Sequence, residues 1–196
     1  MDPFIIPTQI LIIGIYLFRV PLIDRFPQSL KGFYSVLAAD VRFDVGTWWK
    51  TVFVPLLVIV GTYLAWVMFN EIIFHHFPFL SIADPLPLYI AESGILAPIS
   101  EEILQCFFLS AAFTLFKKIY KNTWMITGMC FAALVIASFI FANAHTNPTS
   151  INWLMRFFQF MIYGAIYYLN GRNLLPVIVA HSTWNLILLN PFEWWI

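Results

Sequence analysis

Three short polar motifs interrupt the long apolar stretches of this sequence, and their side chains are of the kinds that hydrolytic enzymes use. Glu101 and Glu102 stand side by side before an apolar run, His145 ends another run, and His181 and Asn185 stand four residues apart in a third. Carboxyl and imidazole groups transfer protons, and an amide can donate a hydrogen bond to a developing oxyanion. We therefore take these five residues as candidates for a catalytic site.

The place of the two glutamates within their apolar run decides between a structural and a chemical role. Pro98 and Ser100 just before them fit a helix start in which Ser100 is the cap and the acids complement the helix dipole. However, residues 103–116 alone form too short a helix to cross a hydrocarbon core of about 30 Å. A span must then include both glutamates, and burial and like charge disfavour their being ionised together. A carboxyl group held in this way suits a general acid or base.

The histidine motifs also have structural alternatives. His145 can be an interfacial residue at a membrane boundary. His181 and Asn185 share one helical face, so they can equally form a hydrogen-bonding pair that joins two helices. His75 and His76, beside a proline-rich stretch, are best interpreted as loop residues.

The composition identifies the kind of element that carries these residues. Hydrophobic residues make up 61% of the chain and charged residues 10%, whereas a soluble domain carries about 25% charge. We therefore predict an all-α, polytopic membrane protein in a lipid bilayer. Ionisable groups inside membrane spans cost roughly 3 kcal/mol each and tend to mark function. The zero net charge argues against nucleic acid as a partner. Cys106 and Cys130 lie in apolar runs and are interpreted as core residues, not as a disulfide or metal pair.

A membrane helix needs roughly 20 residues, and the sequence offers about six apolar segments. These predicted transmembrane helices cover residues 4–20, 52–74, 96–116, 124–144, 153–170 and 174–193. Residues 33–43 are predicted to lie on the membrane, and residues 75–98 hold too many prolines for one regular helix. We expect a single membrane domain over 1–196, with N-terminal spans and an interfacial segment in 1–90 and the catalytic core in 91–190.

The basic residues predict the orientation of these spans. With six spans, all of the ten Lys and Arg residues except Arg156 lie on one side, and that side is expected to be cytoplasmic. Both termini then lie outside, and all three polar motifs lie in the outer half of the membrane. Their common depth predicts one shared site. We expect a multi-pass protein located in a prokaryotic plasma membrane.

The ordered motifs resemble those of the CPBP family of intramembrane proteases, which includes the CAAX prenyl endopeptidases and the bacterial Abi proteins. That family carries EExxxR, FxxxH and HxxxN or HxxxD on successive membrane helices; the matching segments here are 101–106, 141–145 and 181–185. The resemblance covers roughly residues 90–190. Cys106 stands where the family usually has arginine, so the charged contact of that position is missing.

The resemblance implies a glutamate-type intramembrane endopeptidase and a role for each residue. Glu101 would activate a water molecule that His145 holds and polarises. His181 and Asn185 would stabilise the oxyanion, and Glu102 would orient its neighbour. No cofactor is expected. The alternative is a zinc ion held by Glu101, His145 and His181, which the lack of an HExxH motif and the poor ligand Asn185 disfavour.

The predicted outer location of the site favours a membrane-anchored or exported protein or peptide as substrate over a cytosolic prenylated protein. Two other functions remain open at this point. One is a non-proteolytic membrane immunity or scaffold protein. The other is a small proton-coupled transporter, although the internal repeats common in transporters are not found in this sequence.

Overall fold

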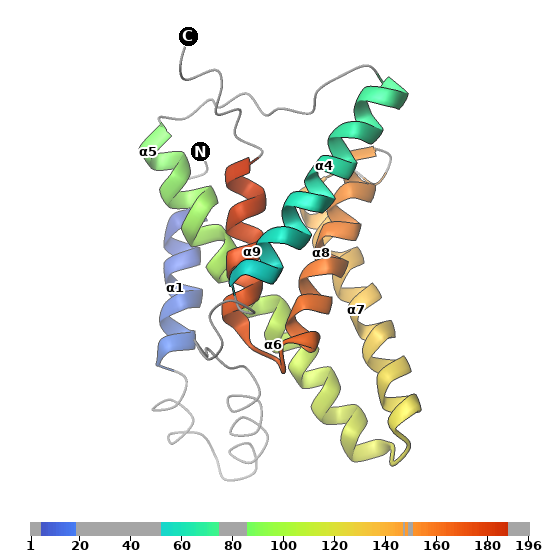
Figure 1. Ribbon diagram of the computed structural model, residues 1–196. Coiled ribbons are helices and arrows are strands. Elements are labelled where there is room, and N and C mark those ends of the chain that lie inside the picture. The colour runs from blue at the N-terminus through green and yellow to red at the C-terminus, as the bar shows by residue number, and fades with distance from the viewer. Residues whose placement is uncertain (1–4, 19–51, 75–85, 147, 149–150, 188–196) are drawn as a thin grey trace.

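The computed structural model describes residues 5–18, 52–74, 86–146, 148 and 151–187. This part of the chain is helical and contains no strand, which confirms the all-α class. The helices are α1 (Ile5–Leu17), α4 (Val54–Phe74), α5 (Leu86–Tyr89), the π-helix η2 (Ile90–Leu96), α6 (Ala97–Ile119), α7 (Thr123–His145), α8 (Ile151–Leu169) and α9 (Leu174–Ile187) (Figure 1). The surface helix predicted at 33–43 and the histidines at 75 and 76 lie outside the described residues.

Helices α5, η2 and α6 form one continuous helical run over residues 86–119, which is longer than the predicted span. Pro98 has no N–H and cannot donate to the carbonyl of Gly94 as an α-helix requires. The chain accommodates this with π geometry, in which the N–H of Ala97 donates to the carbonyl of Glu92. The alternative reading of Ser100 as a helix cap is wrong, because its hydroxyl donates to the carbonyl of Ala97 within the helix.

Two helices of the described residues are long and apolar enough to cross a membrane, Ile90–Ile119 and Thr123–His145. Three further apolar helices are shorter: Ile5–Leu17, Val54–Met68 and Leu174–Ile187. Each of the six predicted spans therefore coincides with a helix, but the count of six crossings stays a prediction.

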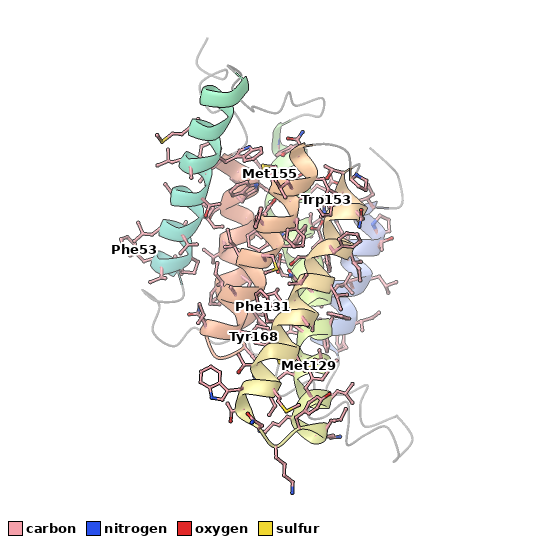
Figure 2. All side chains as sticks on the ribbon, turned by 90° about the vertical axis from the view of Figure 1, so that its right-hand side faces the viewer. Phe53, Met129, Phe131, Trp153, Met155 and Tyr168 are labelled. Carbon is pink, nitrogen blue, oxygen red and sulfur yellow. The ribbon has the colours of Figure 1, made fainter. Side chains whose placement is uncertain are left out.

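The bundle is apolar on its outside and polar at several points inside. On α7 the exposed side chains include Phe131, Ile136 and Phe139. Figure 2 shows such side chains covering the outer surface, with Phe53 and Phe131 among those labelled. The interior buries several polar side chains completely, among them Glu102 and Gln105. This distribution suits a lipid environment, where polar groups are satisfied between helices.

Close approaches at two glycines bring the helices of the site together. A Cβ atom on Gly94 of η2 would lie 2.9 Å from Cδ2 of Leu186 on α9. A Cβ atom on Gly164 of α8 would collide with the Leu134 side chain of α7. Helix α9 packs against α4, η2, α6 and α8, so its residues face several neighbouring helices at once.

Candidate functional site

Glu101 of α6 meets His145 in the last turn of α7. Nε2 of His145 lies 3.2 Å from Oε2 of Glu101, and the two side chains are 27% and 25% exposed. On the other side of the ring, Nδ1 of His145 lies 2.7 Å from the carbonyl oxygen of Phe141. A carbonyl only accepts hydrogen bonds, so Nδ1 carries a hydrogen. In a neutral ring Nε2 then carries no hydrogen and, like the carboxylate oxygen, only accepts hydrogen bonds. The contact with Glu101 is therefore attractive only if a proton lies between Nε2 and the carboxyl group.

Glu102 points away from that contact and binds His181 of α9. Its Oε1 lies 2.7 Å from Nδ1 of His181, and both side chains are buried. The imidazole also stacks on the ring of Tyr163, with 4.7 Å between centroids, and meets Phe160 edge-on. Its free atom, Nε2, lies 3.8 Å from Oε2 of Glu101. The adjacent glutamates therefore bind different histidines, and His181 faces both of them.

Asn185 lies one helical turn after His181 and connects α9 to η2. Its side-chain N–H group donates to the carbonyl oxygen of Ser93 over 2.8 Å. An amide nitrogen carries two hydrogens, so this bond leaves one for another acceptor. The close packing of Gly94 on Leu186 sets the distance between these two helices.

These side chains face a cavity of about 250 Å³. Four of the five predicted site residues line it: Glu101, His145, His181 and Asn185. Glu102 lies behind them and reaches the cavity only through His181. A larger space of about 510 Å³ between α6 and α7 is lined by apolar residues alone and offers no group for acid–base chemistry.

Five polar residues line the cavity that the motifs did not identify: Gln9, Tyr89, Glu92, Ser93 and Arg156. Two of them had a signal in the sequence. Gln9 is an amide within the first apolar run, and Arg156 is the basic residue that the predicted topology places opposite all the others. The rest come from the proline-rich segment before α6, where sequence patterns gave no regular element.

Position 106 does not contribute to the cavity. Cys106 lies one turn after Glu102 and is 1% exposed, and it is a free thiol, as is the buried Cys130. The interpretation of both cysteines as core residues is confirmed. The charge that the resemblance placed at position 106 is thus absent from the interior of α6.

A zinc site requires several donor atoms that converge on one point. Both histidine Nε2 atoms face the same oxygen, Oε2 of Glu101. The part of the chain that the structure describes contains no group of three or more His, Cys, Asp or Glu side chains arranged to hold a metal ion. The zinc alternative therefore has no preformed site among the described residues.

A model of a known protein family matches this region. The family described as type II CAAX prenyl endopeptidase Rce1-like matches residues 83–187, which is more than half of the chain. The matched segment runs from α5 to the end of α9 and contains all five predicted site residues. No curated protein and no solved structure matches the chain.

Proposed function

The chain belongs to the Rce1-like family of type II CAAX prenyl endopeptidases, and we propose that it uses Glu101 as the base of a metal-free peptide hydrolysis. The family makes it a CAAX-type intramembrane endopeptidase that acts on a membrane-associated peptide substrate within a lipid bilayer. The observation that supports the finer proposal is the meeting of Glu101, His145, His181 and Asn185 at one small cavity.

In the proposed reaction, water takes the place of the direct contact between Glu101 and His145. Glu101 removes one proton from the water while its oxygen attacks the carbonyl carbon of the scissile bond. His145 is held by the carbonyl of Phe141 and keeps the water oriented. The carbon–nitrogen bond then breaks, and Glu101 returns the proton to the leaving amine, so that a carboxylic acid and an amine are formed.

His181 and Asn185 are proposed to stabilise the oxyanion of the tetrahedral intermediate. Asn185 has one N–H left after its bond to Ser93. Nε2 of His181 can donate only if the ring carries both protons, or if Glu102 carries a proton and donates it to Nδ1. Glu102 is thus a positioning residue. Loss of a single oxyanion donor lowers kcat by about 10²–10³-fold in other hydrolases.

The proposed substrate is a membrane-anchored or exported precursor, and the proposed location is the outer half of a prokaryotic plasma membrane. The outer half and the substrate class follow from the distribution of Lys and Arg residues. The prokaryotic plasma membrane is proposed from the compact size of a chain with six predicted spans.

The decisive experiment compares protein termini in membrane and exported fractions of cells that make the wild type or Glu101→Gln at equal levels. We expect termini that occur only with the wild type, beside or within hydrophobic segments, and a loss of about 10³-fold or more in the cleavage rate of the variant. Identical termini in both strains, with the cellular phenotype retained by Glu101→Gln, would instead support the scaffold function.

Metal dependence is tested on the purified protein in lipid nanodiscs, with a peptide that copies a cleavage site found in this way. We expect cleavage to continue after treatment with EDTA and 1,10-phenanthroline. If cleavage is lost and added zinc restores it, the metal-free mechanism is wrong, but the protein is still a protease.

A further inference from the structure

Arg156 gives the cavity a fixed positive charge from a helix that carries none of the family motifs. It lies near the start of α8 and lines the same 250 Å³ space as Glu101 and His181. Among the other described basic residues, Lys117 and Lys118 lie in the last turn of α6, and Lys121 lies between α6 and α7, at the ends of these helices opposite to Glu101 and His145. Arg172 lies over the ring of Phe113, 4.4 Å from its centroid. Among the residues that the structure describes, Arg156 is thus the only Lys or Arg that lines this cavity.

The guanidinium group is held in place by buried neighbours. Nη1 of Arg156 donates to Oε1 of Gln159 over 2.9 Å, and Gln159 is 1% exposed. The amide of Gln159 in turn donates to the hydroxyl of Tyr163, whose ring stacks on His181. The same packing thus orients the guanidinium and the catalytic imidazole. The bond to Gln159 uses one of five guanidinium N–H donors.

The chemistry of this arrangement fits a carboxylate. A guanidinium presents parallel N–H donors that match the two oxygens of a carboxylate. The cavity also contains the acidic side chains Glu92 and Glu101, so a substrate carboxylate can be accommodated only where Arg156 offsets them. The small volume leaves room for a short piece of peptide, which keeps this contact close to the scissile bond.

We propose that Arg156 binds a carboxylate of the substrate within a few residues of the cleaved bond, and that this contact selects the substrate. The proposal rests on the proposed protease function. The carboxylate can come from a chain terminus or from an Asp or Glu side chain, because both present the same group.

The competing role for Arg156 is an electrostatic effect on Glu101, and the two roles differ in their kinetics. A residue that binds the substrate carboxylate affects KM, and only for peptides that carry this group. A residue that acts on Glu101 affects kcat for every peptide equally. Measurement of both constants on matched peptides therefore separates the two.

The test uses three versions of one cleavable peptide, with wild-type protein in nanodiscs. The first has its carboxylates intact, the second has a C-terminal amide, and the third has Asn and Gln in place of Asp and Glu. We expect the wild type to lose about 10- to 100-fold in kcat/KM when the recognised carboxylate is removed, as is usual for hydrogen bonds to charged groups. The version that loses activity identifies the source of the carboxylate.

In Arg156→Gln we expect the KM of the intact peptide to rise by the same factor, and the ratio of kcat/KM between the intact and the neutral peptide to fall to about one. Arg156→Lys should recover part of the preference, and Arg172→Gln is the matched control that should keep it. Equal rates of the wild type on all three peptides would overturn the proposal, even if Arg156→Gln fails to fold. A preference that survives in a folded Arg156→Gln would overturn it as well. If the wild type cleaves none of the peptides, the proposed function itself fails.

Discussion

The four titratable residues of the motifs form two pairs in different surroundings. Glu101 and His145 are about one quarter exposed, so water can reach them. Glu102 and His181 are buried, and their contact is shorter. Unequal environments of this kind assign different tasks to chemically similar groups. In the proposed reaction the exposed pair exchanges protons with water, and the buried pair sets the orientation of an imidazole.

Glu102→Gln tests the positioning role, because it keeps the size of a fully buried side chain and removes its charge. If Glu102 acts as a carboxylate that supports a second proton on His181, the amide cannot replace it, and we expect kcat to fall by about 100-fold or more. If Glu102 is instead protonated and donates to Nδ1, the amide N–H can donate in its place and kcat should be retained. KM should be nearly unchanged in both cases, because the side chain does not line the cavity. Steady-state kinetics and thermal unfolding of the same preparation check this.

The matched control is Ser138→Ala, another fully buried polar residue, which lies about two helical turns before His145 on α7 and is absent from the cavity lining. We expect this variant to keep its kcat. Wild-type kcat in a folded Glu102→Gln would exclude a doubly protonated His181 and leave a protonated Glu102 as the donor to Nδ1.

At this scale the motif residues could be predicted, because glutamate and histidine inside apolar runs are costly and stand out. Their partners could not. The stacking of Tyr163 on His181 and the bond from Gln159 to Tyr163 join residues that look ordinary in an amphipathic α8. Their function depends on which helix faces which, and a single sequence does not encode that in any local pattern.

Among the helices, the π segment before α6 has the greatest effect on the site. It places Glu92 and Ser93 on the cavity together with Glu101, and its cause is Pro98, which lacks the N–H of a regular turn. From sequence the prolines indicated a break, and a regular helix is indeed excluded. However, the described part of the segment stays helical, because an i to i−5 bond satisfies the backbone without a break.

The contact between η2 and α9 makes a prediction about Gly94. In Gly94→Val the new side chain would displace Leu186, since a Cβ atom alone would lie 2.9 Å from it. We expect a loss of about 1–3 kcal/mol in the free energy of unfolding, as for other overpacked sites. We also expect a lower kcat, because the distance between Asn185 and Ser93 changes. Denaturant unfolding in detergent and the peptide assay measure both.

Gly128→Val in α7 is the control for Gly94→Val, because it changes the same residue type and nothing lies within 4 Å of its Cβ position. Both variants replace a helical glycine with the same β-branched residue. Equal stability of the two would show that the contact of Gly94 with Leu186 contributes nothing.

For the whole molecule, the existence and order of the helices could be predicted from hydrophobic length, and the described helices begin and end within a few residues of the predicted bounds where these are described. The continuation of α6 back to Leu86 was missed. The sequence predicted that the three polar motifs lie at a common depth and share one site. It did not predict which helices surround the cavity. The contribution of α1 comes through Gln9. Its amide stands out within an apolar run, but no local pattern shows that this helix faces the motif residues, which lie far from it in sequence.

The orientation in the membrane is predicted from charge and is testable with single cysteines. Thr146 follows the end of α7 next to the site, and Lys121 lies at the other end of that helix and is exposed. We expect Thr146→Cys to react with a membrane-impermeant maleimide added outside, and Lys121→Cys to react only after permeabilisation. The native cysteines are buried and give a low background.

If Thr146→Cys is labelled from the cytoplasmic side alone, the orientation of the protein in the membrane is the opposite of the predicted one. The substrate would then be a cytosolic, membrane-attached protein, and the proposed chemistry would be unaffected. The two proposals are therefore independent.

The oxyanion donors at the site determine which segments can be cut at all. In an α-helix each carbonyl oxygen accepts a hydrogen bond from the N–H group four residues later, so it is not free to accept from the N–H that Asn185 keeps after its bond to Ser93. A membrane-spanning segment must therefore melt locally before its carbonyl group reaches the water. In hydrocarbon each backbone group released in this way costs several kcal/mol unless it finds a new partner. The enzyme thus samples helix stability as well as sequence, and stably helical spans of neighbouring proteins are spared because they seldom unwind.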